Sequence, residues 1–222
     1  MLIYLLQLVA WTVFVAALVL WPAGTLAYPG GWVFIGLFTV GGFTMIVWLA
    51  RHSPSLLRER MGSPVQPGQQ PWDRAWLALF IVGFFAWMAF MGRDAAHTGF
   101  AAVPPWLQAV GALGVMFYMV GAWWTFRENV FAAPAVKIQE GQHVIATGPY
   151  AIVRHPLYAS ALFLLIGLPL LLGSWIGLAL SPLFMLGVAW RAVHEERVLR
   201  AELKGYDEYT KRVRSRVIPF VW

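Results

Sequence analysis

Residues that could bind an anionic ligand gather in one polar stretch between long apolar segments, Gln142–Tyr158. Arg154 and His155 come directly before Pro156, and an apolar run starts at Leu157. Because proline suits the first turn of a helix, where its missing N–H is not needed, we expect a helix to begin at Pro156. Arg154 and His155 would then lie beside unpaired backbone N–H groups at the positive end of the helix dipole, which favours an anion. A basic anchor at a membrane interface would use the same residues, and on their own they favour that simpler role.

A second polar cluster follows the next apolar stretch. Arg191 and Glu195 are four residues apart, so on a helix they share one face. Charged side chains at the mouth of an apolar hairpin are costly to desolvate and usually have partners or a function. For Glu196, Arg197 and Arg200, which point around the helix, we expect exposed positions and surface ion pairs worth under about 1 kcal/mol.

The composition is that of a membrane protein. Hydrophobic residues make up 60% of the 222 positions and charged residues 12%, whereas soluble domains carry about 25% charged residues. The length suits one integral-membrane domain, residues 1–222, with four spans in 1–126 and a polar segment, a helical hairpin and a tail in 127–222. The chain has no cysteine, which excludes disulfides and thiolate chemistry, and the spacing of its histidines predicts no metal site.

Hydropathy predicts an all-α, polytopic membrane helix bundle with six transmembrane helices. The uncharged stretch Leu157–Trp190 has 34 residues, too long for one spanning helix and short for two. Pro169, Gly173 and Ser174 near its middle indicate a tight helical hairpin, and five spans remain if one of this short pair is re-entrant. The expected spans are Leu2–Leu20, Trp32–Ala50, Ala75–Met91, Pro105–Phe126, Leu157–Leu172 and Trp175–Arg191.

The connecting segments carry further expectations. Pro54–Met61 could form a short interfacial helix, and a short loop, Gly92–Pro104, joins the third and fourth spans. Apolar residues of the tail recur at helical spacing, which predicts a helix there, and we expect this helix to end at Lys204-Gly205.

Charge distribution predicts the orientation. With the N-terminus inside, the loops at 51–74 and 127–155, the inner end of the last span at Arg191 and the tail hold 15 of the 16 Lys and Arg residues, all except Arg93. The positive-inside rule then places both termini and the two polar clusters on the cytoplasmic side. The formal charge of +6 is therefore explained by membrane topology, and no nucleic-acid partner is expected.

Three motifs carry a family resemblance. They are G-P-Y-x-x-x-R-H-P-x-Y at Gly148–Tyr158, R-x-x-x-E-E at Arg191–Glu196, and GYDEYTKRVRSRVIP at Gly205–Pro219. In this order they resemble the isoprenylcysteine carboxyl methyltransferase family, part of a wider group of integral-membrane methyltransferases that includes phospholipid N-methyltransferases. The resemblance covers about Val136–Pro219, while the N-terminal spans match only in being hydrophobic.

The resemblance implies methyl transfer from S-adenosylmethionine at the cytoplasmic membrane face. It implies that Glu195 binds the amino group or the sulfonium side of the donor, that Arg191 orients the acceptor, and that Arg154 neutralises the donor's carboxylate or braces the site. Arg191 and Glu195 are thus the candidate catalytic residues. The candidate donor-binding residues are Gln139, His143, Val144, Ile145, Ala146, Tyr150, Arg154, His155, Pro156, Leu157, Tyr158 and Glu195.

The acceptor expected from this resemblance is a lipophilic molecule that enters from the bilayer. Membrane lipids are the other expected partners of the protein. A carboxylate acceptor would need no general base, whereas an amine or a thiol must lose a proton, for which Glu195 or His194 is a candidate. A non-catalytic membrane protein, such as a transporter subunit or an assembly factor, is the alternative of another class. A transporter should show polar residues paired across two similar halves, whereas here they concentrate at one corner, which favours an enzyme.

Overall fold

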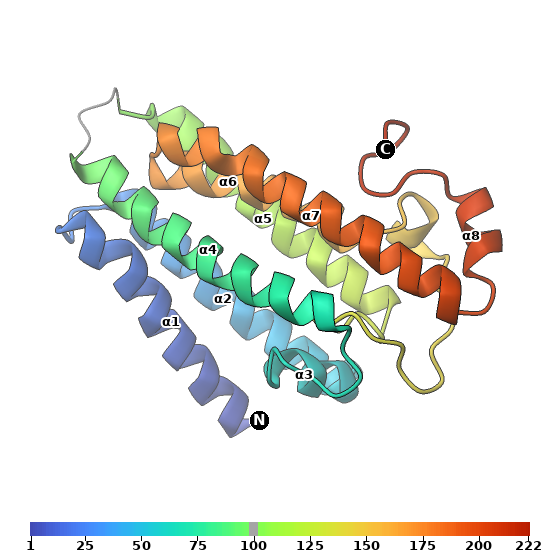
Figure 1. Ribbon diagram of the computed structural model, residues 1–222. Coiled ribbons are helices and arrows are strands. Elements are labelled where there is room, and N and C mark those ends of the chain that lie inside the picture. The colour runs from blue at the N-terminus through green and yellow to red at the C-terminus, as the bar shows by residue number, and fades with distance from the viewer. Residues whose placement is uncertain (98–101) are drawn as a thin grey trace.

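The computed structural model describes residues 1–97 and 102–222, and their regular elements are all helical (Figure 1). The predicted loop Gly92–Pro104 falls partly outside these residues, since α4 continues to His97 and 98–101 are not described. The elements are α1 (Leu2–Ala23), α2 (Pro29–His52), α3 (Pro54–Met61), α4 (Pro71–His97), α5 (Pro105–Glu128), the 3-10 helix η1 (Gly148–Ala151), α6 (Pro156–Leu172), α7 (Trp175–Glu202) and α8 (Tyr206–Arg212).

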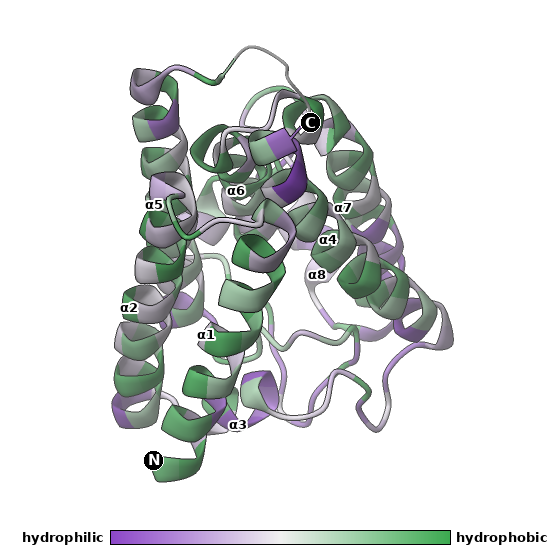
Figure 2. Cartoon of the chain, turned by 90° about the vertical axis from the view of Figure 1, so that its left-hand side faces the viewer, coloured by the Kyte–Doolittle hydropathy of each residue, from purple (hydrophilic) through white to green (hydrophobic). Residues whose placement is uncertain are grey.

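Five of these helices, α1, α2, α4, α5 and α7, are long and apolar enough to cross a membrane. The sixth predicted span, α6, is apolar but has only 17 residues, and it pairs closely with α5 within the bundle. Apolar residues run along the helices, while hydrophilic residues concentrate in α3 and in the connecting segments at one end (Figure 2). The prediction of an all-α membrane helix bundle is therefore confirmed.

The predicted hairpin at the C-terminal end of the bundle has well-defined turn chemistry. Gly173 takes a left-handed conformation with φ 79°, which ends α6 because residues with a Cβ rarely adopt it. Ser174 then caps α7 by accepting a hydrogen bond from the backbone N–H of Gly177 through its side chain. At the other end, α6 begins at Pro156, as its position before an apolar run predicts.

Several helices extend beyond the predicted spans. The helix α4 begins at Pro71 and α7 continues past Arg191 to Glu202. Hydropathy marks only the apolar part of a helix that suits the lipid bilayer. The helix itself can be longer, because its backbone hydrogen bonds form equally well between polar residues. The predicted tail helix is therefore the polar end of α7, and the short α8 follows it after Gly205, whose φ is 86°.

The helices α5 and α6 pack with their backbones in close approach. A Cβ placed on Gly111 would lie 2.4 Å from the backbone nitrogen of Leu171, and one on Gly167 would lie 2.6 Å from the carbonyl oxygen of Gly111. Small residues at such crossings let helices of a membrane protein gain van der Waals contact. The close approach continues to the start of α6, where a Cβ on Gly121 would lie 2.5 Å from Cβ of Ser160, so the Arg-His-Pro segment lies against the end of α5.

The polar segments meet at one end of the bundle, together with both ends of the chain (Figure 1). Gln7 of α1 donates to the carbonyl of Met61 in α3, and Arg60 donates to the carbonyl of Ala132 in the 129–147 segment. The backbone N–H groups of Arg154 and His155 donate to carbonyls of the C-terminal segment, at 215 and 216. This arrangement agrees with the expectation that these segments share one side of the membrane, and which side that is stays a prediction.

Candidate active site

A cavity of about 390 Å³ opens at this polar end, between α4, α5, α6, α7 and the segment 129–150. Its volume lies in the range of ligand-binding pockets. One part of its wall is polar and comes from the two clusters that the sequence singles out. Another part is apolar and follows α4, α6 and α7, through Trp76, Leu77, Phe80, Phe84, Leu164, Leu165 and Val188.

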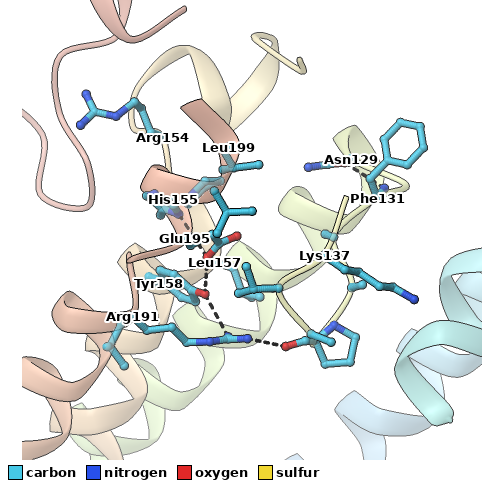
Figure 3. A pocket seen from close by; sticks show the side chains of 18 of the residues that line it. Asn129, Phe131, Lys137, Arg154, His155, Leu157, Tyr158, Arg191, Glu195 and Leu199 are labelled. Carbon is cyan, nitrogen blue, oxygen red and sulfur yellow. Dashed lines mark hydrogen bonds and ion pairs between the residues drawn. The ribbon is translucent and has the colours of Figure 1, made fainter. Parts of the chain in front are cut away.

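A chain of hydrogen bonds joins three helices in the polar wall (Figure 3). Tyr158 of α6 donates its phenolic hydrogen to Oε2 of Glu195 over 2.6 Å and accepts from Nη1 of Arg191 over 2.9 Å. Arg191 in turn donates from Nε to Oδ1 of Asp73, at 2.8 Å, and from Nη2 to the carbonyl of Pro134, at 2.6 Å. The guanidinium also lies 4.9 Å from the centre of the Trp76 ring. These hydrogen bonds and the ring contact hold the side chains of Arg191 and Glu195 in defined positions.

His155 caps the start of α6 and is buried between Tyr158 and the acidic residues of α7. Its ring stacks on Tyr158, with centroids 5.3 Å apart and planes 9° from parallel. Nδ1 lies 3.8 Å from Oε2 of Glu195, and Nε2 lies 3.3 Å from Oε1 of Glu196. Nε2 is not aligned for a hydrogen bond with that oxygen and has no hydrogen-bond partner among the described residues.

The prediction that Glu196 is exposed and forms only a surface pair is wrong. The side chain is 3% exposed, and its carboxylate accepts from Nε of Arg154 at 2.6 Å and from Nε of Arg216 at 2.9 Å. Arg154 also donates to the carbonyls of Val213 and Arg214. The C-terminal segment folds back over this face of α7 and covers Glu196, which helical spacing alone does not reveal.

This network distinguishes between the two roles expected for Arg154. Its guanidinium points away from the other labelled pocket residues and into the C-terminal segment (Figure 3). Of the two expected roles, bracing the site therefore fits this geometry, and neutralising a ligand carboxylate does not. The backbone N–H groups of Arg154 and His155 are likewise used by the carbonyls at 215 and 216, so they do not form an open anion site.

Tyrosines from the connecting segments complete the polar wall. The hydroxyl of Tyr150 accepts a hydrogen bond from Nδ2 of Asn129 at 2.8 Å, which leaves its own proton available as a donor. Burial raises the pKa of Tyr150, so its phenol stays neutral at physiological pH. Tyr206 is buried and its hydroxyl has no hydrogen-bond partner among the described residues, while Tyr209 donates to the carbonyl of Tyr150.

The structure brings most of the predicted site residues to this one cavity. Gln139 and Ala146 are not among the described residues that line it. Gln139 donates from Nε2 to the carbonyl of Phe131, and Ala146 packs against the cluster of Leu203, Tyr206 and Tyr209. The predicted residues in the lining are His143, Val144, Ile145, Tyr150, Arg154, His155, Pro156, Leu157, Tyr158, Arg191 and Glu195, and their roles stay predictions.

Other residues of the site were not predicted. Asp73 is fully buried and holds Arg191, yet it precedes the third apolar span by only two residues and reads as part of a polar loop. Asn129 directly follows α5, and its side chain donates to the hydroxyl of Tyr150. The only sequence signal for Asp73 is an acidic residue next to an apolar span, which is costly unless it is paired.

Comparisons with known proteins agree with this arrangement. Residues 106–204 match the family described as phospholipid methyltransferase, which is just under half of the chain and contains all the cavity residues of α6 and α7. The fold is similar to the solved structure of the eukaryotic intramembrane Ras methyltransferase, isoprenylcysteine carboxyl methyltransferase, with a TM-score of 0.51 at 19% sequence identity. That match covers 96% of this chain and 75% of the other. None of the curated proteins compared with the chain matches it significantly. The C-terminal half of the chain is thus similar to phospholipid methyltransferases, and the chain as a whole shares the fold of an intramembrane methyltransferase.

Proposed function

We propose that this protein is a methyltransferase that uses S-adenosylmethionine and acts at the cytoplasmic membrane face on a lipophilic acceptor. One observation carries the proposal. Arg191, Tyr158 and Glu195 form a hydrogen-bonded chain in the wall of a ligand-sized cavity, and buried Asp73 holds Arg191 from behind. All three lining residues lie within the segment 106–204 that matches a methyltransferase family.

The cavity residues fit the chemistry of the donor. Tyr206 lines the cavity, and its buried hydroxyl has no hydrogen-bond partner in the described chain, as expected of a group that binds a polar ligand. Glu195 offers a carboxylate to a cationic ammonium or sulfonium, and Tyr150 and Tyr158 present aromatic faces to it. Val144, Ile145, Leu199 and Leu203 give an apolar surface for an adenine ring. Bound S-adenosylmethionine would supply an electrophilic methyl group.

The site is suited to a reaction in which positioning does most of the work. An acceptor must be held in line with the methyl group, and correct alignment can account for a large part of the barrier reduction. Arg191 can bind a carboxylate acceptor and leave a lone pair of the nucleophilic oxygen unprotonated. Because such an acceptor is already ionised near pH 7, no residue needs to remove a proton. We therefore propose carboxyl O-methylation as the first candidate for the reaction of this protein.

The apolar wall supports an acceptor that comes from the bilayer. Trp76, Phe80 and Phe84 line the cavity from α4, a helix that qualifies as a membrane span, and Leu164 and Val188 face them from α6 and α7. A chain of methylene groups would bury apolar surface there, at about 0.8 kcal/mol for each buried group.

Amine N-methylation is the second candidate, because the family match names phospholipid methyltransferases. An amine or thiol acceptor must lose a proton, and Glu195 is then the candidate base. His194 is not in the cavity lining. It stacks on Trp190 with centroids 3.8 Å apart and lies near Trp72, which assigns it to the outer face of α7.

Incubation of the purified protein with donor labelled in the methyl group, together with fractionated membrane lipids, tests the proposal. We expect label in a lipid fraction, in alkali-labile form if the product is a carboxyl ester and in alkali-stable form if it is an amine. Glu195→Ala protein is the control for non-enzymatic labelling. Absence of Glu195-dependent label in all fractions would contradict a methyltransferase function.

A further inference from the structure

The cavity is lined by several basic side chains whose charges are neutralised to different degrees. Lys137 pairs with Glu59 at 3.0 Å, Arg154 with Glu196 at 2.6 Å and Arg191 with Asp73 at 2.8 Å. The remaining lining arginine is Arg60, on α3, and it has no carboxylate partner anywhere in residues 1–97 and 102–222. Among the described lysines and arginines of the wall, Arg60 is therefore the one whose positive charge meets the cavity without a compensating carboxylate.

Arg60 is held in place without using up its donors. Its guanidinium lies 4.1 Å from the centre of the Phe126 ring, and Nη1 donates to the carbonyl of Ala132 at 2.9 Å. A guanidinium has five N–H groups, so this bond leaves several for a ligand. Stacking and a single hydrogen bond fix the plane of the fork, which suits planar recognition of a carboxylate or a phosphate.

Arg60 and Arg191 influence one another across the cavity. Burial lowers the pKa of Arg60, the charge of Arg191 lowers it further, and the phenols of Tyr118, Tyr150 and Tyr158 act in the opposite direction. Arg191 donates three hydrogen bonds within the described chain, which leaves two of its N–H groups. Two cations that face one cavity favour an anion between them.

The surroundings of Arg60 indicate what else this anion carries. Arg60 also lines a second hollow of about 190 Å³ between α1, α2 and α3, whose other residues are apolar: Leu8, Trp11, Phe38, Gly42, Met45, Ile46, Leu49, Leu57 and Met61. Arg60 thus lies where a polar cavity meets an apolar hollow. An amphiphile with an anionic head and an alkyl tail matches both sides of this boundary, whereas the donor has no alkyl tail to fill the apolar hollow.

We infer that Arg60 binds the anionic group, a carboxylate or a phosphate, of the lipophilic acceptor and so selects acidic amphiphiles as substrates. The inference rests on the proposed function and adds to it the charge class of the acceptor. The carboxylate of the donor has the same chemistry, and the experiment below separates the two sources.

The test uses purified protein in detergent and matched variants. Arg60→Gln removes the charge, Arg60→Lys keeps it, and Arg58→Gln alters an exposed arginine of the same short helix. The first measurement is titration with S-adenosylhomocysteine. The second is displacement of radiolabelled palmitate by unlabelled palmitate, hexadecyl phosphate and methyl palmitate, which is the neutral counterpart of the first probe.

We expect the unmodified protein and the Arg58→Gln variant to bind palmitate and hexadecyl phosphate more tightly than methyl palmitate. In Arg60→Gln the ratio of palmitate affinity to methyl palmitate affinity should fall about 10- to 100-fold, which is the effect of losing one hydrogen-bonded charge. Arg60→Lys should retain most of this ratio. Donor affinity should stay within about twofold of the original in all three variants.

Four results would overturn the inference. The first is that the unmodified protein binds neither anionic probe, and the second is that palmitate binding does not depend on Arg60. The third is an equal loss of palmitate affinity in Arg60→Lys and Arg60→Gln, which would indicate a structural role. The fourth is a loss of donor affinity alone, which would assign Arg60 to the carboxylate of the donor. Failure of the proposed function has a different signature, because the unmodified protein would then not bind S-adenosylhomocysteine at all.

Discussion

Nε of Arg191 donates to Oδ1 of Asp73 over 2.8 Å, and the side chain of Asp73 is fully buried. The second oxygen of Asp73 accepts from Nε2 of Gln69 and from the backbone N–H of Val136, at 2.9 and 2.8 Å. One carboxylate thus joins α4, α7 and the segment that follows α5. This contact orients the arginine that we assign to the acceptor, and it also holds the wall of the cavity together.

Asp73→Asn should therefore both destabilise the protein and slow turnover. Removing one partner of a buried ion pair costs about 3–5 kcal/mol, because the remaining charge stays desolvated. The melting temperature in detergent, together with methyl transfer measured below that temperature, checks this. Asp207→Asn is the matched control, since Asp207 and Arg200 form an exposed pair at 2.5 Å that should contribute little. Equal melting temperatures for the two variants would contradict the role given to Asp73.

Glu196→Gln should release the C-terminal segment. Glu196 accepts from Arg216 of this segment and from Arg154, and Arg154 donates to the carbonyls of Val213 and Arg214. Loss of the carboxylate charge therefore weakens the direct pair with Arg216 and the pair that positions Arg154. Limited trypsin digestion followed by mass spectrometry should show faster cleavage after Arg214 and Arg216. Glu202→Gln, at an exposed position of the same helix, should digest as the unmodified protein does. Protection of these sites in Glu196→Gln would show that the tail is held by something else.

Gly111→Ala should destabilise the bundle more than the same change elsewhere. The added Cβ would lie 2.4 Å from the backbone nitrogen of Leu171, so α5 and α6 must separate, at a cost of about 1–3 kcal/mol. A Cβ on Gly36 of α2 meets nothing within 4 Å, which makes Gly36→Ala the control. Melting temperatures of the two variants in the same detergent give the comparison, and a smaller loss for Gly111→Ala than for Gly36→Ala would disprove close packing of this pair.

Arg191→Ala should slow turnover by more than it weakens donor binding. If Arg191 orients the acceptor, its removal lowers kcat/KM while the affinity for S-adenosylhomocysteine stays near that of the unmodified protein. Steady-state rates and titration calorimetry on one preparation separate these effects, with the melting temperature recorded because Asp73 loses its partner. A variant with reduced donor affinity and unchanged kcat would mean that Arg191 serves the donor.

The sequence predicts the parts of the site that depend on local pattern. Pro156 before an apolar run marks the start of α6, and the pair Gly173-Ser174 marks the turn of the hairpin, because both use backbone chemistry of adjacent residues. Arg191 and Glu195 share a face of α7 through helical spacing alone. Local pattern therefore identifies most of the cavity residues.

What the sequence does not predict depends on contacts between distant segments. Asp73 and Arg191 are 118 residues apart, so no spacing rule links them. The burial of Glu196 requires the tail to fold back over α7, and the guanidinium of Arg154 is used by that same tail. Gln139 and Ala146 lie within the predicted donor segment, yet they pack behind the described cavity lining, against Phe131 and against the cluster of Leu203, Tyr206 and Tyr209.

The most direct test of the account is calorimetric titration of the purified protein with S-adenosylmethionine, alongside Glu195→Ala, His155→Ala and the exposed control Glu202→Ala. Glu195 and His155 both line the cavity, and Nε2 of His155 is without a hydrogen-bond partner in the described chain. We predict that the unmodified protein and Glu202→Ala bind the donor with equal affinity, and that each of the other two variants binds about tenfold or more weakly. Donor binding at full affinity by both cavity variants, or no binding by the unmodified protein, would contradict the assignment of this cavity as the donor site.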